Sequence, residues 1–288
     1  MPPSALICSV TVAAGILFVP FQAPAQTENA TQPNIATAAF SLAGPWTRSD
    51  PEARFLPPVS GPGPLEDDPA HPHHGHREGV PGQPDLSATP WVADLSNPIL
   101  KPWVAAMVKK NAERGLAGEE IETTLRNCRP DGVPGSLMRR DNVQVLQSPA
   151  EVTIFYQLDH QARHIYLNVP HTNHPMPSYY GESIGHYEGS TLVVDTIALN
   201  ERTTVDPYNT PHSDQLHVVE RYHLVDGGKT LQVDFTVDDP KVFNMPWSGI
   251  VHYRHSRDSY EEVVCAENDI DIRTGKPYPI PIAAKPDF

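Results

Sequence analysis

The sequence predicts a mainly β protein whose strands form one antiparallel, barrel-like sheet. From Val143 onward, short runs of residues alternate between apolar and polar side chains, which is the period of a strand with one buried face. Turn signals such as Ser148-Pro149 and Asp226-Gly227-Gly228 separate these runs, and most connections are short. Short connections favour antiparallel neighbours, and closure into a barrel would remove the exposed sheet edges. The expected strands are VQVLQ, VTIFYQL, RHIYLN, TLVVDTIAL, LHVVERYHLVD, TLQVDFTVDD, SGIVHYRHS and YEEVVCAE.

One or two helices precede this β region and are expected to pack on it. The stretch ILKPWVAAMVKKNAERGLAG follows Asn97-Pro98, and Gly115 or Gly118 can end it. Its apolar residues recur at helical spacing at Ile99, Trp103, Met107 and Val108. A second short helix is expected over EEIETTLRN. Together, the helices and the curled sheet predict a lipocalin-like architecture.

The 288 residues divide into a leader, an irregular extension and one folded domain. Residues 1–25 contain an apolar run followed by Ala23-Pro24-Ala25, which predicts a signal peptide, with a membrane anchor as the alternative. Residues 26–97 are rich in Pro, Gly and His and are expected to be largely irregular, with a histidine cluster from His71 to His76. Residues 98–288 form the β-rich domain. The expected location is therefore secreted or periplasmic.

Charge and cysteine content limit the partners and the redox state. The chain has 35 acids against 21 bases, a formal net charge of -14, and no basic stretch with interleaved aromatics. This composition argues against nucleic acid and against stable membrane insertion after processing. Removal of the leader would leave Cys128 and Cys265, which in an oxidising compartment most simply form one disulfide. The oligomeric state is not predicted.

Two carboxylates lie within apolar strand patterns. Asp195 falls inside TLVVDTIAL, and Glu220 shares a period-two face with Val218 and Tyr222. An ionised group on an apolar face is costly unless it is paired, so both positions are candidate functional residues. Arg163, in line with the apolar residues of its own strand, is the natural partner for either acid. A structural ion pair explains these charges as well as catalysis does.

Histidines near the expected strand ends favour an enzyme. We expect Asp195 or Glu220 to orient His186 or His217 as a general base, with His160 close by and Arg163 stabilising negative charge. The substrate, a small organic molecule, would lie against the aromatic residues Tyr156, Tyr166, Tyr222 and Trp247. Elimination, hydration, cyclisation or isomerisation needs only such groups, which corresponds to a lyase or an isomerase.

Two other functions fit the same residues. A lipocalin-like binding protein would have the pocket without the base. A metal-dependent hydrolase would hold a divalent ion, although no cofactor is required by the first hypothesis. Its ligands would be His160, His186, His212 and His217.

The segment Gly181–Gly185 fits the G-x-S-x-G pattern of serine hydrolases. A nucleophile elbow needs a strand before the serine and a helix after it. Here a loop rich in Pro and Tyr precedes Ser183, and a second turn follows, so Ser183 is expected to be a turn hydroxyl.

The string GESIGHYEGSTLVVDT, followed by PHSDQLHVVERY, VDDPKVFNMPW and VVCAEN, resembles a largely uncharacterised group of secreted bacterial proteins. The recurring pattern of that group is G-H-S-I-G-x-W-E-G-D-T-L-V-V-D-T, P-H-S-x-x-L-H-V-V-E-R and D-P-x-x-x-x-x-P-W. The match covers about residues 128–268. The resemblance implies secretion but no particular reaction. The chain departs from the pattern at Glu182, His186, Tyr187 and Ser190, where His, Arg, Trp and Asp are usual.

Overall fold

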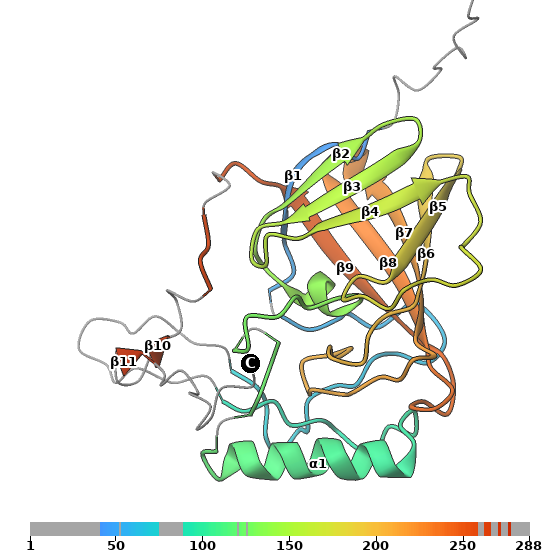
Figure 1. Cartoon of the computed structure of the whole chain (residues 1–288). Helices are drawn as coiled ribbons and strands as arrows, with labels where there is room; N and C mark the ends of the chain where they lie inside the picture. The colour runs from blue at the N-terminus through green and yellow to red at the C-terminus, as the bar shows by residue number, and fades with distance from the viewer. Residues whose placement is uncertain are drawn as a thin grey trace, which may run out of the picture. The chain divides into compact units, whose positions relative to one another are not determined.

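A computed structural model of the chain contains a closed barrel (Figure 1). It describes residues 41–51, 53–74, 89–119, 121–124, 126–258 and 262–265, and only the backbone of 270–271 and 276–277. The leader expected over residues 1–25 and His76 lie outside the described residues. Within the described part, nine strands follow one another around the barrel in chain order, and the last pairs with the first.

The predicted barrel-like sheet is confirmed, with one departure from the antiparallel pattern. All neighbouring strands are antiparallel except β4 and β5, which are parallel. The strands are β1 (Gly44–Arg48), β2 (Val143–Gln147), β3 (Glu151–Tyr156), β4 (Ala162–Leu167), β5 (Glu182–Glu188), β6 (Thr191–Ile197), β7 (His217–Val225), β8 (Thr230–Asp238) and β9 (Trp247–His255). Two short 3-10 turns, η1 (Gly135–Met138) and η2 (Asp226–Gly228), and a separate pair, β10 (Ile270–Asp271) and β11 (Lys276–Pro277), complete the elements.

The barrel interior is filled by the inward half of each alternating strand. In β8, Leu231, Val233 and Phe235 are buried, while the residues between them are partly exposed. Aromatic rings from different strands meet there, as Phe235 and Trp247 do with centroids 5.8 Å apart. Gly249 of β9 leaves room for this packing, because a Cβ atom there would lie 2.6 Å from the Phe235 ring. Burial of side chains of this size contributes about 1.5–3 kcal/mol each, which makes the interior the main source of stability.

Two strands of the barrel were not predicted from the sequence. The extension was expected to be irregular, yet Gly44–Arg48 forms β1 and closes the barrel between β2 and β9. Trp46 anchors β1, since its side chain is fully buried and its Nε1 donates to the Leu42 carbonyl at 2.8 Å. The segment Glu182–Glu188, expected to be a turn, is β5. By contrast, the described residues of the last expected strand, 262–265, are not in a strand.

Helix α1 (Pro102–Leu116) confirms the first predicted helix, but with a different buried face. It buries Val104, Val108 and Ala112, whereas Trp103 and Met107 are exposed. The helix lies beyond one end of the barrel in Figure 1, where Lys101 N donates to the Val242 carbonyl at 3.0 Å.

The second expected helix is absent from the described residues 121–124 and 126–128, which form turns. Side chains in this segment form local hydrogen bonds with a nearby carboxylate and with the backbone. Thr124 Oγ1 donates to the Asp131 carboxylate, and Asn127 Nδ2 donates to the Thr123 carbonyl at 3.2 Å. Such local bonds compete with helix formation.

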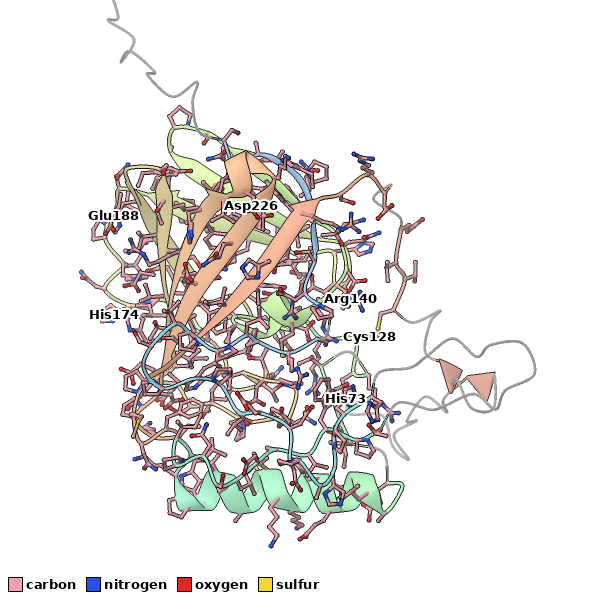
Figure 2. The ribbon with its side chains drawn as sticks, turned by 180° about the vertical axis from the view of Figure 1, so that it is seen from behind. His73, Cys128, Arg140, His174, Glu188 and Asp226 are labelled. Atoms are coloured by element: carbon pink, nitrogen blue, oxygen red, sulfur yellow. A yellow bond between two sulfur atoms is a disulfide. The ribbon has the colours of Figure 1, made fainter. Side chains whose placement is uncertain are left out.

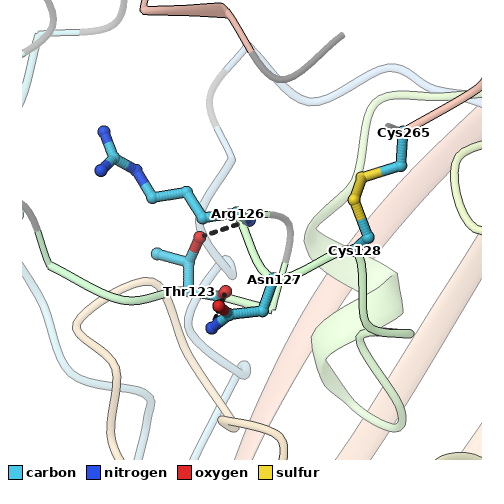
Figure 3. Close-up of a disulfide and its surroundings, with 5 residues drawn as sticks. All are labelled: Thr123, Arg126, Asn127, Cys128 and Cys265. Carbon is cyan, nitrogen blue, oxygen red and sulfur yellow. Dashed lines mark hydrogen bonds between the residues drawn. A yellow bond between two sulfur atoms is a disulfide. The ribbon is translucent and has the colours of Figure 1, made fainter. Parts of the chain in front are cut away.

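The predicted disulfide between Cys128 and Cys265 is confirmed (Figure 3). The two Cα atoms lie 5.7 Å apart across a sequence separation of 137 residues. The bond ties the chain after α1 to the chain after β9. Among the described residues, no helix is long and apolar enough to cross a membrane.

Candidate functional site

Strands β4 to β7 carry charged side chains on both faces, and these form two separate groups. We call Arg163, Ser183, Thr196, Glu220 and Tyr222 the inner cluster, because their side chains point into the barrel. We call His171, Thr172, Glu182, Asp195 and His217 the outer cluster, because it lies on the outer surface of the same sheet. Neighbouring residues on a strand point to opposite faces, so Glu182 and Ser183, and likewise Asp195 and Thr196, belong to different clusters.

The inner cluster is centred on an ion pair between Arg163 and Glu220. Arg163 Nη1 donates to Glu220 Oε1 at 3.0 Å, and Nη2 donates to Oε2. Two more guanidinium hydrogens are also used: Nε donates to Ser183 Oγ at 3.0 Å and Nη2 to Thr196 Oγ1 at 2.8 Å. Both charged side chains have no exposed surface. A bidentate pair with these extra donors and acceptors satisfies the groups it buries.

A tyrosine completes the inner cluster. Tyr222 OH donates to Glu220 Oε1 at 2.7 Å. Burial, reinforced by the Glu220 charge, raises the pKa of Tyr222 well above its usual value, so this phenol stays neutral. The inner cluster therefore has no free base and no exposed acid, and its geometry is that of a structural pair that links β4 to β7 across the barrel interior.

The outer cluster is centred on one carboxylate oxygen. His217 Nε2 and His171 Nε2 each lie 3.0 Å from Asp195 Oδ1. His217 starts β7 and is the diagonal neighbour of Asp195, which pairs with Val219. The side chains of Asp195 and His217 are 40% exposed, so solutes reach them.

A second carboxylate holds His171 from its other side. His171 Nδ1 lies 2.9 Å from Glu182 Oε1, which also accepts from Thr172 N at 2.8 Å. Thr172 Oγ1 donates to Glu182 Oε2 at 2.7 Å. Partial burial alone would raise the pKa of Glu182, but the hydrogen bonds from Thr172 and His171 outweigh it and lower the pKa.

These contacts limit the hydrogen-bonding roles that the two imidazoles can take. Both nitrogens of His171 face carboxylate oxygens that only accept hydrogen bonds, so His171 makes both bonds only as an imidazolium. His217 presents a single nitrogen to Asp195. The tautomer that donates Nε2–H there carries a lone pair on Nδ1, which makes His217 a base oriented by a carboxylate.

The sequence interpretation of Asp195 needs correction. Its strand was taken to have one apolar face, but both faces are apolar: Val194 points inward, and Val193 is only 7% exposed on the outside. His186 and Arg221 stand opposite Val193 on the neighbouring strands and cover it. Asp195 shares this outer face and does not pair with Arg163.

The other predicted histidines are not part of either cluster. His186 is half-exposed on β5 and lies 3.3 Å from Glu188. His160 sits in the β3–β4 turn, where its Nε2 accepts from Val263 N at 3.2 Å. His212 is buried against Thr203, and burial lowers its pKa. The four expected metal ligands thus have four different sets of partners, and among the described residues no three His, Cys, Asp or Glu side chains are arranged to hold an ion.

The predicted aromatic residues do not line one surface. Tyr156, Tyr222 and Trp247 are buried in the interior, whereas Tyr166 is 47% exposed on the outside of β4. Ser183, within the G-x-S-x-G pattern, is in the inner cluster and has no access to a substrate, so the serine-hydrolase interpretation is excluded.

The sequence interpretation missed His171 and the role of Glu182. Both depend on the connection between β4 and β5, because parallel neighbours need a crossover instead of a tight turn. This crossover brings His171 over the outer face, and Figure 2 shows His174, from the same connection, on the same side of the molecule as Glu188 of β5. The unusually long loop between two short strands was the signal available in the sequence.

No known protein family and no curated protein matches the chain. Among solved structures, it is similar to a luciferase domain from the dinoflagellate Lingulodinium polyedrum, with 10% sequence identity and a TM-score of 0.25. The similarity covers 80% of this chain and 57% of that one.

Proposed function

We propose that the protein is a secreted or periplasmic enzyme that moves protons on a small organic substrate at the outer cluster. The observation that carries this proposal is the Asp195 carboxylate, which lies 3.0 Å from His217 Nε2 and 3.0 Å from His171 Nε2. A carboxylate that orients an exposed imidazole is the usual arrangement of a general base. The disulfide, the apolar N-terminal stretch and the resemblance to a secreted bacterial group support the location.

The reaction uses each residue in a different way. His217 Nδ1 accepts a proton from the substrate, and Asp195 stabilises the imidazolium that forms. His171 donates to the same carboxylate oxygen and, held by Glu182 on its other side, fixes the position of Asp195. His217 then returns the proton to the product or the leaving group. Elimination, hydration, cyclisation and isomerisation all follow this course. Arg163, expected to stabilise negative charge, is enclosed in the barrel and does not contact a substrate at the outer cluster.

A general proton-abstraction probe tests the proposal without knowledge of the substrate. Nitrobenzisoxazole opens to a coloured phenolate when a base removes one ring proton. The protein should accelerate this reaction above free imidazole at equal concentration, and His217→Ala should lower the rate by roughly 10²-fold. Asp195→Asn should lower it as well, because the amide no longer orients the imidazole.

The matched control is His223→Ala. His223 also lies on β7 and pairs with a carboxylate, Asp234, at 3.4 Å, but it is outside the outer cluster. Its replacement should leave the rate unchanged. Equal loss in His217→Ala and His223→Ala, or no acceleration by the unmodified protein, would overturn the proposal and leave a binding protein as the better hypothesis. A rate that requires an added divalent ion would instead favour the metal-dependent alternative.

A further inference from the structure

A groove of about 500 Å³ lies between α1 and the extension, away from both clusters. One wall is held by backbone hydrogen bonds between residues 66–68 and 92–94 of the extension. Asp68 N donates to the Val92 carbonyl and Asp94 N to the Glu66 carbonyl, both at 2.8 Å. The volume is in the range of sites that hold small organic molecules.

The floor of the groove is apolar. Val92 and Ala93 come from the extension, and Val108 and Ala112 come from the buried stripe of α1. Leu116, at the end of the helix, remains 48% exposed at the edge of the groove. An exposed leucine beside a concave apolar floor is surface that a hydrocarbon ligand would cover, and removal of that surface from water favours binding.

The rim of the groove is acidic. Three carboxylates and two basic groups line it, namely Asp68, Asp94, Glu113, His71 and Lys109. Asp68 faces His71 Nδ1 at 2.8 Å, and Glu113 faces Lys109 at 3.9 Å. Asp94 differs from these pairs: Oδ1 accepts from Ser96 N at 2.8 Å, and no basic side chain of the described residues forms an ion pair with it. A half-buried carboxylate at the edge of an apolar floor, without a cation of its own, attracts a cation from outside.

We infer that this groove is a second binding site, which takes a small organic cation with a hydrocarbon body. The ammonium group donates to Asp94, and the hydrocarbon covers Leu116 and the floor between Val92 and Ala112. The site is independent of the outer cluster and of the proposed proton chemistry, since the two share no residue.

Calorimetric titration of the full chain with decylammonium, below its micelle concentration, tests the inference. Decanoate and decanol are the matched probes, with the same hydrocarbon and a negative or absent charge. We expect one decylammonium per chain, and binding at least roughly tenfold weaker for the other two probes, as one charge-assisted hydrogen bond predicts.

Two variants locate the site. Asp94→Asn keeps the acceptor for Ser96 but removes the charge, and should weaken decylammonium binding roughly tenfold. Leu116→Ser should weaken all three probes, because it removes exposed apolar surface without touching the buried core. Asp226→Asn, at the exposed β7–β8 turn, is the control and should bind normally. Equal affinity for decanoate and decylammonium, or unchanged binding by Asp94→Asn, would overturn the inference whatever the outcome of the nitrobenzisoxazole assay.

Discussion

Each face of β4 to β7 carries a paired carboxylate, but the two pairs differ in partner and in exposure. Inside the barrel, Glu220 pairs with a guanidinium that also donates to Ser183 and Thr196, and neither charge reaches water. Outside, Asp195 lies near two imidazoles at the surface. His217 presents only Nε2 to this carboxylate, so its Nδ1 is left for a substrate. The difference lies in the partner: arginine stays charged at all relevant pH values, whereas histidine gains and loses a proton near neutrality.

The inner pair, Arg163 and Glu220, therefore serves stability, whereas the outer pair, His217 and Asp195, serves the proposed reaction. A buried pair loses its hydration on folding and contributes only if both members are present. An exposed histidine–carboxylate pair contributes little to stability, because water screens it, but it can exchange protons with a solute. Substitutions on the inner face should therefore change the free energy of unfolding, and substitutions on the outer face should change rates.

The largest effect is expected for Glu220→Gln, which leaves the Arg163 charge buried without its partner. The free energy of unfolding, measured by urea denaturation, should fall by about 3–5 kcal/mol. The matched control is Glu188→Gln on the outer face, where Glu188 pairs with Arg221 at 2.6 Å but is half-exposed. That change should cost much less, because water screens an exposed pair. Equal costs for the two variants would show that burial does not distinguish the faces.

A smaller effect is expected for Tyr222→Phe, which removes only the hydrogen bond from the phenol to Glu220. A hydrogen bond to a charged group contributes about 1.5–3 kcal/mol, and thermal and urea unfolding should both report a loss in this range. Combined with Glu220→Gln, the loss should be less than the sum of the two single changes, because the residues share one contact. Simple additivity would contradict a common inner cluster.

The dependence of the unfolding free energy on pH in the acid range should depend on Glu182. Its pKa is lowered in the folded protein, so its stabilising contribution is present above its ordinary value of 4.5 and is lost as the pH falls through the lower, folded value. In Glu182→Gln, the dependence of the unfolding free energy on pH should become shallower below 4.5. Thr236→Ala is the control, because its hydroxyl bonds to Ser248 Oγ and not to a carboxylate, and it should leave the slope unchanged. An unaltered slope in Glu182→Gln would show that His171 and Thr172 do not hold the carboxylate.

The smallest effect is expected for His186→Ala. His186 lies on the outer face, outside the outer cluster, and its ring lies 3.3 Å from Glu188, with both side chains half-exposed. Its loss should cost less than about 1 kcal/mol and leave the nitrobenzisoxazole rate near normal. A loss of rate comparable to that of His217→Ala would extend the reactive surface to β5.

The sequence predicted the inner cluster better than the outer one for a physical reason. Strand periodicity places Glu220 beside Val218 and Tyr222, and an acid there requires a cation from another inward position, which Arg163 supplies. The contact between Asp195 and His217 also follows from neighbouring strands. His171 does not, because its place depends on how the long crossover folds over the sheet, and loop conformation has no periodic signal.

Strand β5 was mistaken for a turn because three glycines occur in nine residues, at Gly181, Gly185 and Gly189. Two of them do flank the strand with positive φ, but Gly185 is inside it. A Cβ atom on Gly185 would lie 2.9 Å from Ile165 Cγ2 on the parallel neighbour, so the glycine permits close pairing of β4 with β5. Sequence alone does not distinguish this role from a turn.

The protonation of the individual imidazole nitrogens, observed by heteronuclear NMR near neutral pH, tests the central claim most directly. The account predicts that His217 is neutral, with its hydrogen on Nε2 and a bare Nδ1, and that His171 carries hydrogens on both nitrogens. Asp195→Asn should perturb both rings while leaving His223 unchanged. A His217 protonated on Nδ1, or a neutral His171, would contradict the assignment of an oriented base beside a fixed cation.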